Sequence, residues 1–291
     1  MSRGPAAGIE SLPELLEKNL IWSKGVVMSR FSLAIVIALL LTGCSTVPIT
    51  GRSQLNLIPG SSMLSMSADQ YGTFLKENKL SQNAQQTATV KRVGARIQDA
   101  VERYFVSAGL QDHLKSYKWE FNLVEDKQVN AWCMPGGKVV VYTGILPVAL
   151  DDAGLAVVMG HEIAHAIAEH GNERMSQGLI AQLGGTALSA ALATKPEATR
   201  QLWMSVYGVG SQYGALMPYG RMQESEADHL GLVFMTMAGY DPNVAISFWE
   251  RMAAQKGGQA QPEFLSTHPA DATRIANIKR LIPSVLSTYR K

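Results

Sequence analysis

Gly160-His161-Glu162-Ile163-Ala164-His165 is an HExxH sequence that lies within an apolar, helix-forming stretch. On a helix, residues four apart share a face, so both imidazoles can reach one metal ion. Glu162 can then lie beside the open coordination position and accept a proton from water, as in zinc hydrolases and most often in peptidases. The neighbouring residues are apolar nearly all round, which indicates burial, and buried polar groups are costly unless they are paired or bound to metal. A surface helix with a chance match is therefore the weaker interpretation, and the pattern predicts one Zn²⁺ per chain.

A third protein ligand is expected, because catalytic zinc commonly has three and keeps the fourth position for water. His170 follows closely but lacks the glycine spacing of metzincins. Glu224 is the better candidate: Glu224 and Asp228 are four residues apart, so one can bind zinc while the other orients a ligand histidine from behind. Glu226 is the second choice because it points in another direction. Without HExxH, this acidic cluster would be interpreted as a solvated helix face.

His268, in Thr267-His268-Pro269, has three interpretations. It can donate a hydrogen bond to the oxyanion, or it can act as a fourth zinc ligand that closes the open position and keeps the enzyme latent. The third interpretation is a turn histidine without a role in the site. Arg274 can orient Asp228 or the substrate, although an ordinary surface arginine fits equally well.

Three stretches have the pattern of strands: Lys118–Val124, Val129–Cys133 and Lys138–Thr143, the last two reversing at Pro135-Gly136-Gly137. A strand beside the HExxH helix can bind an extended substrate as an added strand, a mode that recognises backbone more than side chains. The residues expected to do so are Asn130, Ala131, Lys138, Val139, Val140 and Val141.

The rest of the chain is predicted to be mainly helical, over about 63–108, 220–238, 245–255 and 270–282. Leu179–Ala193 is apolar, rich in Gly and Ala, and short for a membrane span. Helices packed over the active site are therefore preferred to a membrane contact. The expected fold class is α+β: a mostly helical, zincin-like metalloprotease domain with a small sheet whose edge strand flanks the HExxH helix.

The N-terminal region has the pattern of a secretory signal, with a basic start at Met28-Ser29-Arg30 and an apolar run before Leu41-Thr42-Gly43-Cys44. Its end resembles a bacterial lipobox, cleaved before Cys44 and lipidated there; an uncleaved anchor or a buried strand are the alternatives. We therefore expect a leader (1–43) comprising a mis-assigned or non-native start (1–27) and a lipoprotein signal peptide (28–43), followed by a lipidated tether (44–62) and a zinc metallopeptidase domain (63–291). Ser45 after the cysteine predicts the cell outer membrane, facing the periplasm.

Composition limits the function further. The 26 Lys and Arg nearly balance the 24 Asp and Glu, so nothing indicates nucleic-acid binding. With Cys44 lipidated, Cys133 has no partner and no internal disulfide is expected. The predicted domain is long enough to bury a substantial core.

Several motifs together resemble metallopeptidase family forty-eight: HExxH, the Glu224 to Asp228 segment, Thr267-His268-Pro269 with Arg274, Asn130-Ala131-Trp132 and Tyr142-Thr143-Gly144. This family includes HtpX, CAAX prenyl protease and Oma-like peptidases, and the chain looks most like its short BepA-like periplasmic lipoprotein branch. The resemblance implies a zinc endopeptidase that hydrolyses misfolded or unassembled envelope proteins and is attached to the membrane by the lipid on Cys44.

Three other functions remain open at this stage. A chaperone-like outer-membrane assembly factor would use a largely structural, four-ligand zinc site, since structural zinc sites are closed. A zinc amidase acting on cell-wall peptides would use similar chemistry. A lipid-anchored binding module is the least suitable, because it leaves the buried HExxH unexplained.

Overall fold

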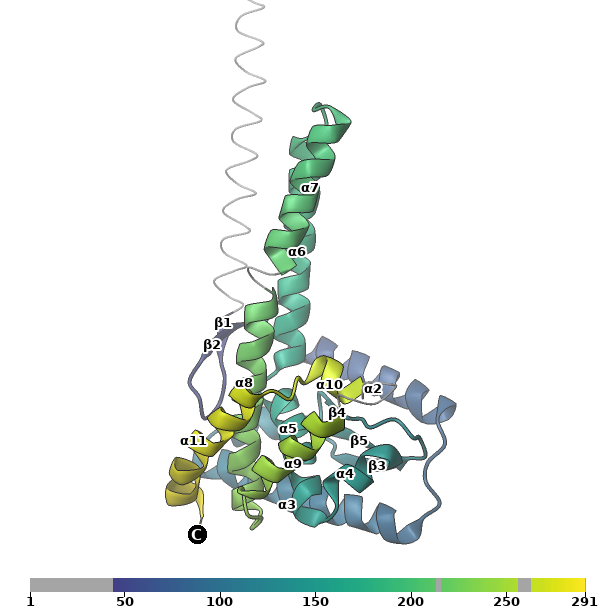
Figure 1. The fold of residues 1–291 in the computed structure, drawn as a ribbon, viewed down its shortest axis with the longest axis vertical. Helices are drawn as coiled ribbons and strands as arrows, with labels where there is room; N and C mark the ends of the chain where they lie inside the picture. The colour runs from purple at the N-terminus through teal and green to yellow at the C-terminus, as the bar shows by residue number, and fades with distance from the viewer. Residues whose placement is uncertain (1–43, 213–215, 256–262, 291) are drawn as a thin grey trace, which may run out of the picture. The chain divides into compact units, whose positions relative to one another are not determined.

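A computed structural model of the chain describes residues 44–212, 216–255 and 263–290. The predicted leader, residues 1–43, lies outside the described residues. The unit Thr46–Lys291 is mostly helical with small sheets (Figure 1), so the predicted α+β fold class is confirmed.

A three-stranded sheet supports the HExxH helix. Its strands are β3 (Glu120–Val124), β4 (Ala131–Met134) and β5 (Lys138–Tyr142), in the order β3-β5-β4. β4 and β5 are antiparallel, as predicted, and their turn contains Gly136 and Gly137 at φ 85° and 81°, where glycine is favoured. β3 runs parallel to β5. β5 is therefore the central strand and β4 forms an edge of this sheet.

The helices account for most of the remaining described residues. They are α2 (Gly60–Glu77), α3 (Ala84–Ser107), α4 (Leu146–Ala149), α5 (Asp152–Ile167), α6 (His170–Ala191), α7 (Glu197–Ser211), α8 (Met217–Met237), α9 (Val244–Ala254), α10 (Glu263–Thr267) and α11 (Ala272–Tyr289). Two 3₁₀ turns, η1 (Gln111–Leu114) and η2 (Thr143–Ile145), and two short strands, β1 (Cys44–Thr46) and β2 (Ser53–Leu55), complete the set.

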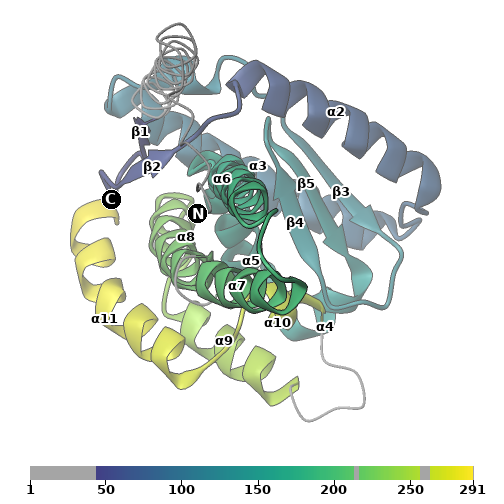
Figure 2. The same cartoon turned by 90° about the horizontal axis from the view of Figure 1, so that it is seen from above.

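Residues 63–108, predicted to be helical, form two helices, α2 and α3. The chain leaves α2 after Glu77 because Leu80 forms a β-bridge with Val124 at the end of β3. Asn83 then caps α3 by accepting a hydrogen bond from the Gln86 N–H at 3.1 Å. The break places α2 on one face of the sheet and α3 on the other side, next to α5 (Figure 2).

The HExxH helix, α5, is the centre of the core. Asp151 caps its first turn by accepting a hydrogen bond from the Gly154 N–H at 2.9 Å. Every residue from Gly154 to Ile167 is buried, as the apolar sequence indicates. The helix ends at Ile167, and the left-handed backbone of Glu169 (φ 55°) then turns the chain directly into α6.

A close contact between α5 and α8 depends on two glycines. A Cβ at Gly231 would lie 3.0 Å from the backbone nitrogen of His161, and one at Gly160 would lie 3.1 Å from the Gly231 carbonyl oxygen. Side chains at these positions would therefore push the two helices apart. Their absence brings the backbone of α8 directly against the HExxH turn.

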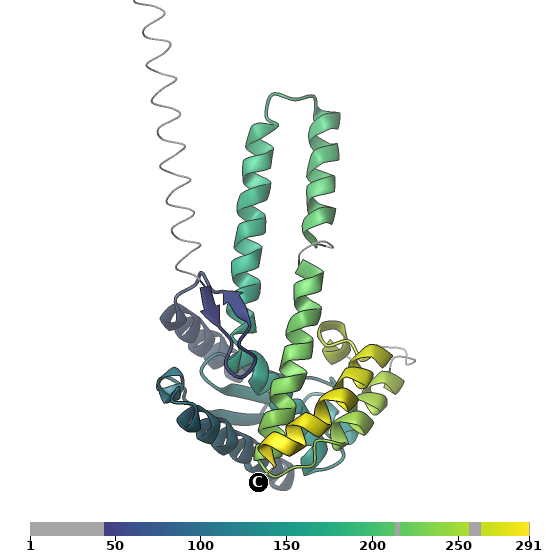
Figure 3. The same cartoon turned by 90° about the vertical axis from the view of Figure 1, so that its left-hand side faces the viewer.

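Helices α6 and α7 pair with each other and extend away from the sheet (Figure 3), so the predicted packing of Leu179–Ala193 over the active site is wrong. The sides of this pair expose Leu183 and Trp203, with 68% and 52% of their surface accessible. None of the described helices combines the length and apolar character that a membrane crossing requires.

Residues 46–58 do not form a free tether. The turn between β1 and β2 is closed by a hydrogen bond from Val47 N–H to the Arg52 carbonyl at 2.8 Å. Further along, Leu57 N–H donates to Ser176 Oγ at 2.8 Å and Asn172 Nδ2 donates to the Ile58 carbonyl at 2.8 Å. The segment is thus fixed to the base of α6 by polar contacts that the turn-forming composition does not predict.

Replacing Gly231 by Ala tests the helix contact. We expect the free energy of unfolding to fall by about 1–3 kcal/mol, because the added methyl group meets backbone atoms that cannot rotate away. Gly72→Ala is the matched control: it lies in α2 with nothing within 4 Å of its Cβ position, and should be neutral or stabilise by up to about 1 kcal/mol. Denaturant unfolding measures both, and equal stabilities would contradict the contact.

Candidate active site

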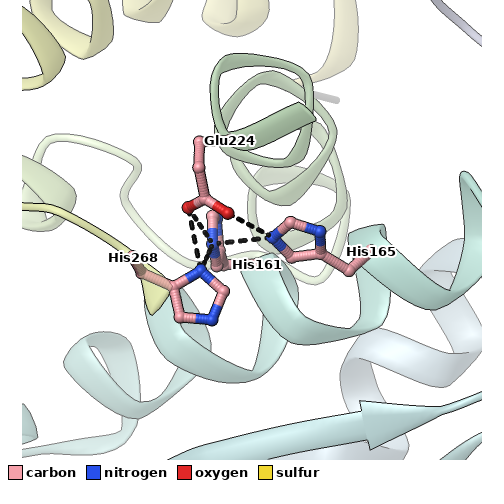
Figure 4. Close-up of side chains that lie close together, drawn as sticks. All are labelled: His161, His165, Glu224 and His268. Carbon is pink, nitrogen blue, oxygen red and sulfur yellow. Dashed lines mark hydrogen bonds and ion pairs between the residues drawn. The ribbon is translucent and has the colours of Figure 1, made fainter. Parts of the chain in front are cut away.

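Four side chains from three parts of the chain converge on one point (Figure 4). They are His161 and His165 of α5, Glu224 of α8, and His268, which follows α10. One ligand atom from each lies within 4.8 Å of all the others. The two α5 imidazoles face each other, with their Nε2 atoms 3.1 Å apart. The structure thus brings together all four residues for which the sequence predicts a place in or at the metal site.

Glu224 connects the cluster through both carboxylate oxygens. Oε2 lies 3.3 Å from His161 Nε2 and 2.8 Å from His268 Nδ1, and Oε1 lies 3.3 Å from His165 Nε2. Burial opposes ionisation of this carboxyl, but its contacts with the three imidazoles outweigh burial and hold its pKa far below the usual range. The site therefore holds a partly buried anion with three imidazole nitrogens around it, and Arg274 Nη1 lies 3.4 Å from its Oε2.

Glu162 lies beside this cluster without a hydrogen bond to its Oε1 atom, which is fully buried within the described residues. His268 Nε2 is 3.5 Å away. Burial raises the pKa of Glu162 to about 7. A buried carboxyl with a free acceptor oxygen and a raised pKa has the properties of a general base for neutral pH.

Asp228 and Arg274 support His161 from behind. Arg274 donates to both Asp228 oxygens, at 2.8 Å and 2.6 Å, and its guanidinium lies 3.4 Å above the ring of Trp249. Asp228 Oδ1 is 3.1 Å from His161 Nδ1, on the ring edge opposite the cluster. The structure thus places Asp228 as the sequence predicts, and Arg274 is buried against it rather than on the surface.

His165 has a comparable support that the sequence did not reveal. Its Nδ1 lies 2.8 Å from Nδ1 of His170, the first residue of α6, and His170 Nε2 lies 3.0 Å from Glu226. The sequence indicates His170 only as a candidate metal ligand and Glu226 only as the second choice for the third ligand. A third histidine shortly after a buried HExxH helix was the available signal, since such a residue also needs a partner.

A cleft of about 760 Å³ opens onto the cluster. Asn130, Ala131, Trp132 and Cys133 form one wall, and Thr267, Pro269 and Asn277 contribute to others. In the antiparallel ladder, Tyr142 N–H donates to the Asn130 carbonyl. Because hydrogen-bonded and non-bonded pairs alternate, the backbone groups of Ala131 and Cys133 point away from β5, toward the free edge.

The prediction that Lys138, Val139, Val140 and Val141 pair with a substrate needs correction. These residues form the central strand, with β3 on one side and β4 on the other, and all of them are buried. Their backbone groups are thus already engaged. Of the predicted residues, Ala131 has backbone groups directed at the open edge, whereas Asn130 pairs with Tyr142 through its carbonyl and lines the cleft.

The donor set fits a metal ion. Two imidazole nitrogens 3.1 Å apart and a carboxylate within 3.3 Å of both are poorly matched as hydrogen-bond partners, since the three groups face one point. Two histidines and a carboxylate are a common set of protein ligands for catalytic zinc. His268 adds a third nitrogen with 12% of its side chain exposed.

Comparisons with known proteins agree with a metal-binding, peptidase-type site. The model of the family described as Peptidase family M48 matches residues 91–282. The mitochondrial metalloendopeptidase OMA1 of Schizosaccharomyces pombe is 32% identical over 241 residues, covering 81% of this chain and 66% of its own length. Metalloendopeptidase OMA1, mitochondrial, of Bos taurus is 30% identical over 282 residues, covering 95% of this chain and 53% of its own.

A bacterial relative matches less of the chain. The beta-barrel assembly-enhancing protease of Escherichia coli is 28% identical over 189 residues, covering 61% of this chain and 38% of its own length. The chain therefore spans less than two thirds of each of these three curated relatives.

The prediction of a lipid-anchored protein of the cell outer membrane, facing the periplasm, is wrong. The relatives that align with 81% and 95% of the chain are mitochondrial enzymes, whereas the bacterial relative aligns with 61%. The signal peptide and the lipid attachment at Cys44 belong to the same prediction, and the mitochondrial relatives give them no support.

Removing Arg274 should be strongly destabilising. We expect Arg274→Met to lower the free energy of unfolding by about 3–5 kcal/mol, because it leaves Asp228 buried without a countercharge. Arg274→Met combined with Asp228→Asn should recover part of this loss, since no charge is then left unpaired. Denaturant unfolding of the single and double variants measures the coupling, and strictly additive losses would contradict it.

Proposed function

We propose that this chain, which belongs to peptidase family M48, is a zinc-dependent endopeptidase that hydrolyses misfolded or unassembled proteins. The observation that carries the proposal is the convergence of His161, His165 and Glu224 beside Glu162, a buried general base with a free oxygen. The cleft that leads to them supplies space for a peptide.

His161, His165 and Glu224 are the proposed zinc ligands. Zinc bound by them lowers the pKa of water and polarises a carbonyl group. Asp228 and Arg274 hold the ring of His161 in the orientation that binding requires. Glu162 accepts the proton of the attacking water through Oε1 and then delivers it to the leaving amine. Its pKa of about 7 suits both steps at neutral pH.

The free edge of β4 is the proposed binding site for the substrate backbone. Along the cleft wall, Cys133 offers an N–H and a C=O group and Ala131 offers a C=O group, in the spacing of an antiparallel ladder. The N–H of Ala131 donates to Oδ1 of Asn130 at 2.9 Å, a contact that a substrate carbonyl would replace. An extended peptide added there runs past Glu162. Since such pairing requires an extended backbone and few particular side chains, it favours unfolded segments over folded proteins.

His268 is proposed to keep the enzyme latent. Its Nδ1 lies 3.2 Å from His161 Nε2 and 2.8 Å from Glu224, among the donor atoms rather than above them. This position suits a fourth ligand that occupies the place of water. It suits an oxyanion donor less well, because such a donor must lie within hydrogen-bond distance of the position that the substrate carbonyl oxygen will occupy, away from the metal ligands.

The same observation favours a second candidate function. Four donors that close the coordination shell are typical of structural zinc. A chaperone-like assembly factor, whose zinc stabilises the fold, would be built in this way. The two functions differ in whether Glu162 matters for activity.

Glu162→Gln should reduce hydrolysis of an unfolded, fluorescently labelled protein by about 10²- to 10⁴-fold, the usual contribution of a general base. Zinc binding, measured by competition with a chromophoric chelator, should be retained because Glu162 is not a proposed ligand. Glu102→Gln, an exposed change on α3, is the control. Unchanged hydrolysis in Glu162→Gln would favour the chaperone-like function.

His268→Ala should raise the rate of hydrolysis several-fold while one zinc ion per chain stays bound. The reason is that removing the fourth donor leaves the proposed three-ligand set with an open position. The assay uses the same labelled protein, with zinc content measured in parallel. A lower rate with full zinc occupancy would instead assign His268 to substrate or oxyanion binding.

A further inference from the structure

A buried chain of hydrogen bonds leads away from the metal site through His165. His165 Nδ1 faces His170 Nδ1 at 2.8 Å, and His170 Nε2 faces Glu226 Oε2 at 3.0 Å. His170 is completely buried, and His165 and Glu226 are 6% and 7% exposed. The mechanism above uses neither His170 nor Glu226.

The direction of each hydrogen bond follows from the end of the chain. An ionised carboxylate only accepts, so His170 must donate from Nε2 to Glu226. A neutral His170 then has a lone pair on Nδ1, and His165 must donate to it from its own Nδ1. This leaves the Nε2 lone pair of His165 directed at the metal cluster, which is the tautomer a ligand needs.

Glu226 is held by a turn near the start of the described chain. Arg52 Nε donates to Glu226 Oε2 at 2.8 Å, and Thr50 donates its hydroxyl to Oε1. Because Arg52 supplies the countercharge, Glu226 needs no positive charge on His170. Arg52 also forms a two-pronged ion pair with Glu173 of α6, at 2.7 Å and 2.9 Å.

The backbone of this turn is strained in a way that brings these groups into place. Ile49, a β-branched residue, has φ 70°, in the left-handed region that such residues rarely adopt. Residues with strained backbone persist where surrounding contacts require them and are concentrated at functional sites. Here the strain lies next to Thr50, which contacts Glu226.

We propose that His170 and Glu226 are positioning residues that fix His165 in its metal-binding tautomer. Through their contacts with Glu226, Arg52 and Thr50 make this tautomer depend on the docking of residues 46–58. The proposal rests on the proposed function in taking His165 as a zinc ligand. Metal affinity therefore depends on a segment that contributes no ligand itself.

The test measures zinc affinity of the whole chain by chelator competition and the absorption spectrum of the Co²⁺-loaded protein. We expect His170→Leu and Glu226→Gln to weaken zinc binding by about 10- to 100-fold, as for other partners of metal-bound histidines, and to change the Co²⁺ spectrum. His170→Asn should recover part of the affinity, because its amide oxygen can accept the hydrogen bond from His165. Arg52→Met should cause a smaller loss.

Glu173→Gln is the matched control, since it weakens an ion pair of the same Arg52 without contacting His170. It should lower stability and cost less zinc affinity than Glu226→Gln, with a Co²⁺ spectrum close to that of the unmodified chain, because Glu226 and His170 keep their contact. Wild-type affinity and spectrum in both His170→Leu and Glu226→Gln would overturn the proposal.

Long-range ¹H–¹⁵N spectra of the zinc-loaded chain assign the tautomers directly and do not require a variant to fold. Protons on His165 Nδ1 and His170 Nε2 would support the proposed chain of hydrogen bonds, and a proton on His170 Nδ1 would overturn it. None of these readouts needs hydrolysis. If zinc binding depends on His170 and Glu226 as expected but activity does not depend on Glu162, the proposed function is refuted and the positioning role of His170 and Glu226 stands.

Discussion

The backbone contact between α5 and α8 is the constraint on which the site depends. Gly160 and Gly231 allow a separation in which a methyl group would already meet the backbone of the HExxH turn. At that separation Glu224 of α8 reaches both His161 and His165, at 3.3 Å from each. Packing without side chains between the two helices thus provides the geometry that metal binding needs. Stability and ligand geometry are linked at this point, because any residue that separates the helices also withdraws the carboxylate.

Helix α8 also supplies three carboxylates, each with a separate task. Glu224 and Asp228 share the face toward α5, whereas Glu226 points toward the base of α6. Each anion has partners of opposite charge or with donor groups: imidazoles and Arg274 for Glu224, Arg274 and His161 for Asp228, and Arg52 with His170 for Glu226. Buried charges are tolerated only when paired in this way. The pairing also places a carboxylate behind each of the two α5 histidines, directly for His161 and through His170 for His165.

The local features could be predicted from the sequence because local rules determine them. HExxH in an apolar stretch indicates a buried helix with two imidazoles on one face, and Pro135-Gly136-Gly137 indicates the β4–β5 reversal. The parallel pairing of β3 with β5 could not be predicted in this way, since it depends on contacts distant in sequence, and it makes Lys138–Val141 central rather than an edge. The roles of His170 and Arg52 were missed for the same reason: Arg52 lies among turn-forming residues that resemble a linker, and its partners are more than a hundred residues away. The apolar α6–α7 pair was misplaced because composition indicates a contact surface but not what it contacts.

The four donors at the centre of the cluster are not equivalent. His161 and His165 belong to a buried helix and Glu224 belongs to the helix packed against it, so the α5–α8 contact fixes the backbone of all three. His268 follows the short helix α10 and precedes Pro269. Its ring contacts Glu224, His161 and the ring of Phe264, and its backbone N–H donates to the Phe264 carbonyl at 2.8 Å. It is thus the donor whose departure disturbs the core least. An exchangeable fourth ligand, as proposed for His268, on three ligands from the packed helices α5 and α8 is the arrangement expected of a regulated catalytic site, because those three would keep their geometry when the fourth leaves. A purely structural zinc site has no need for this division, which is why we favour the peptidase.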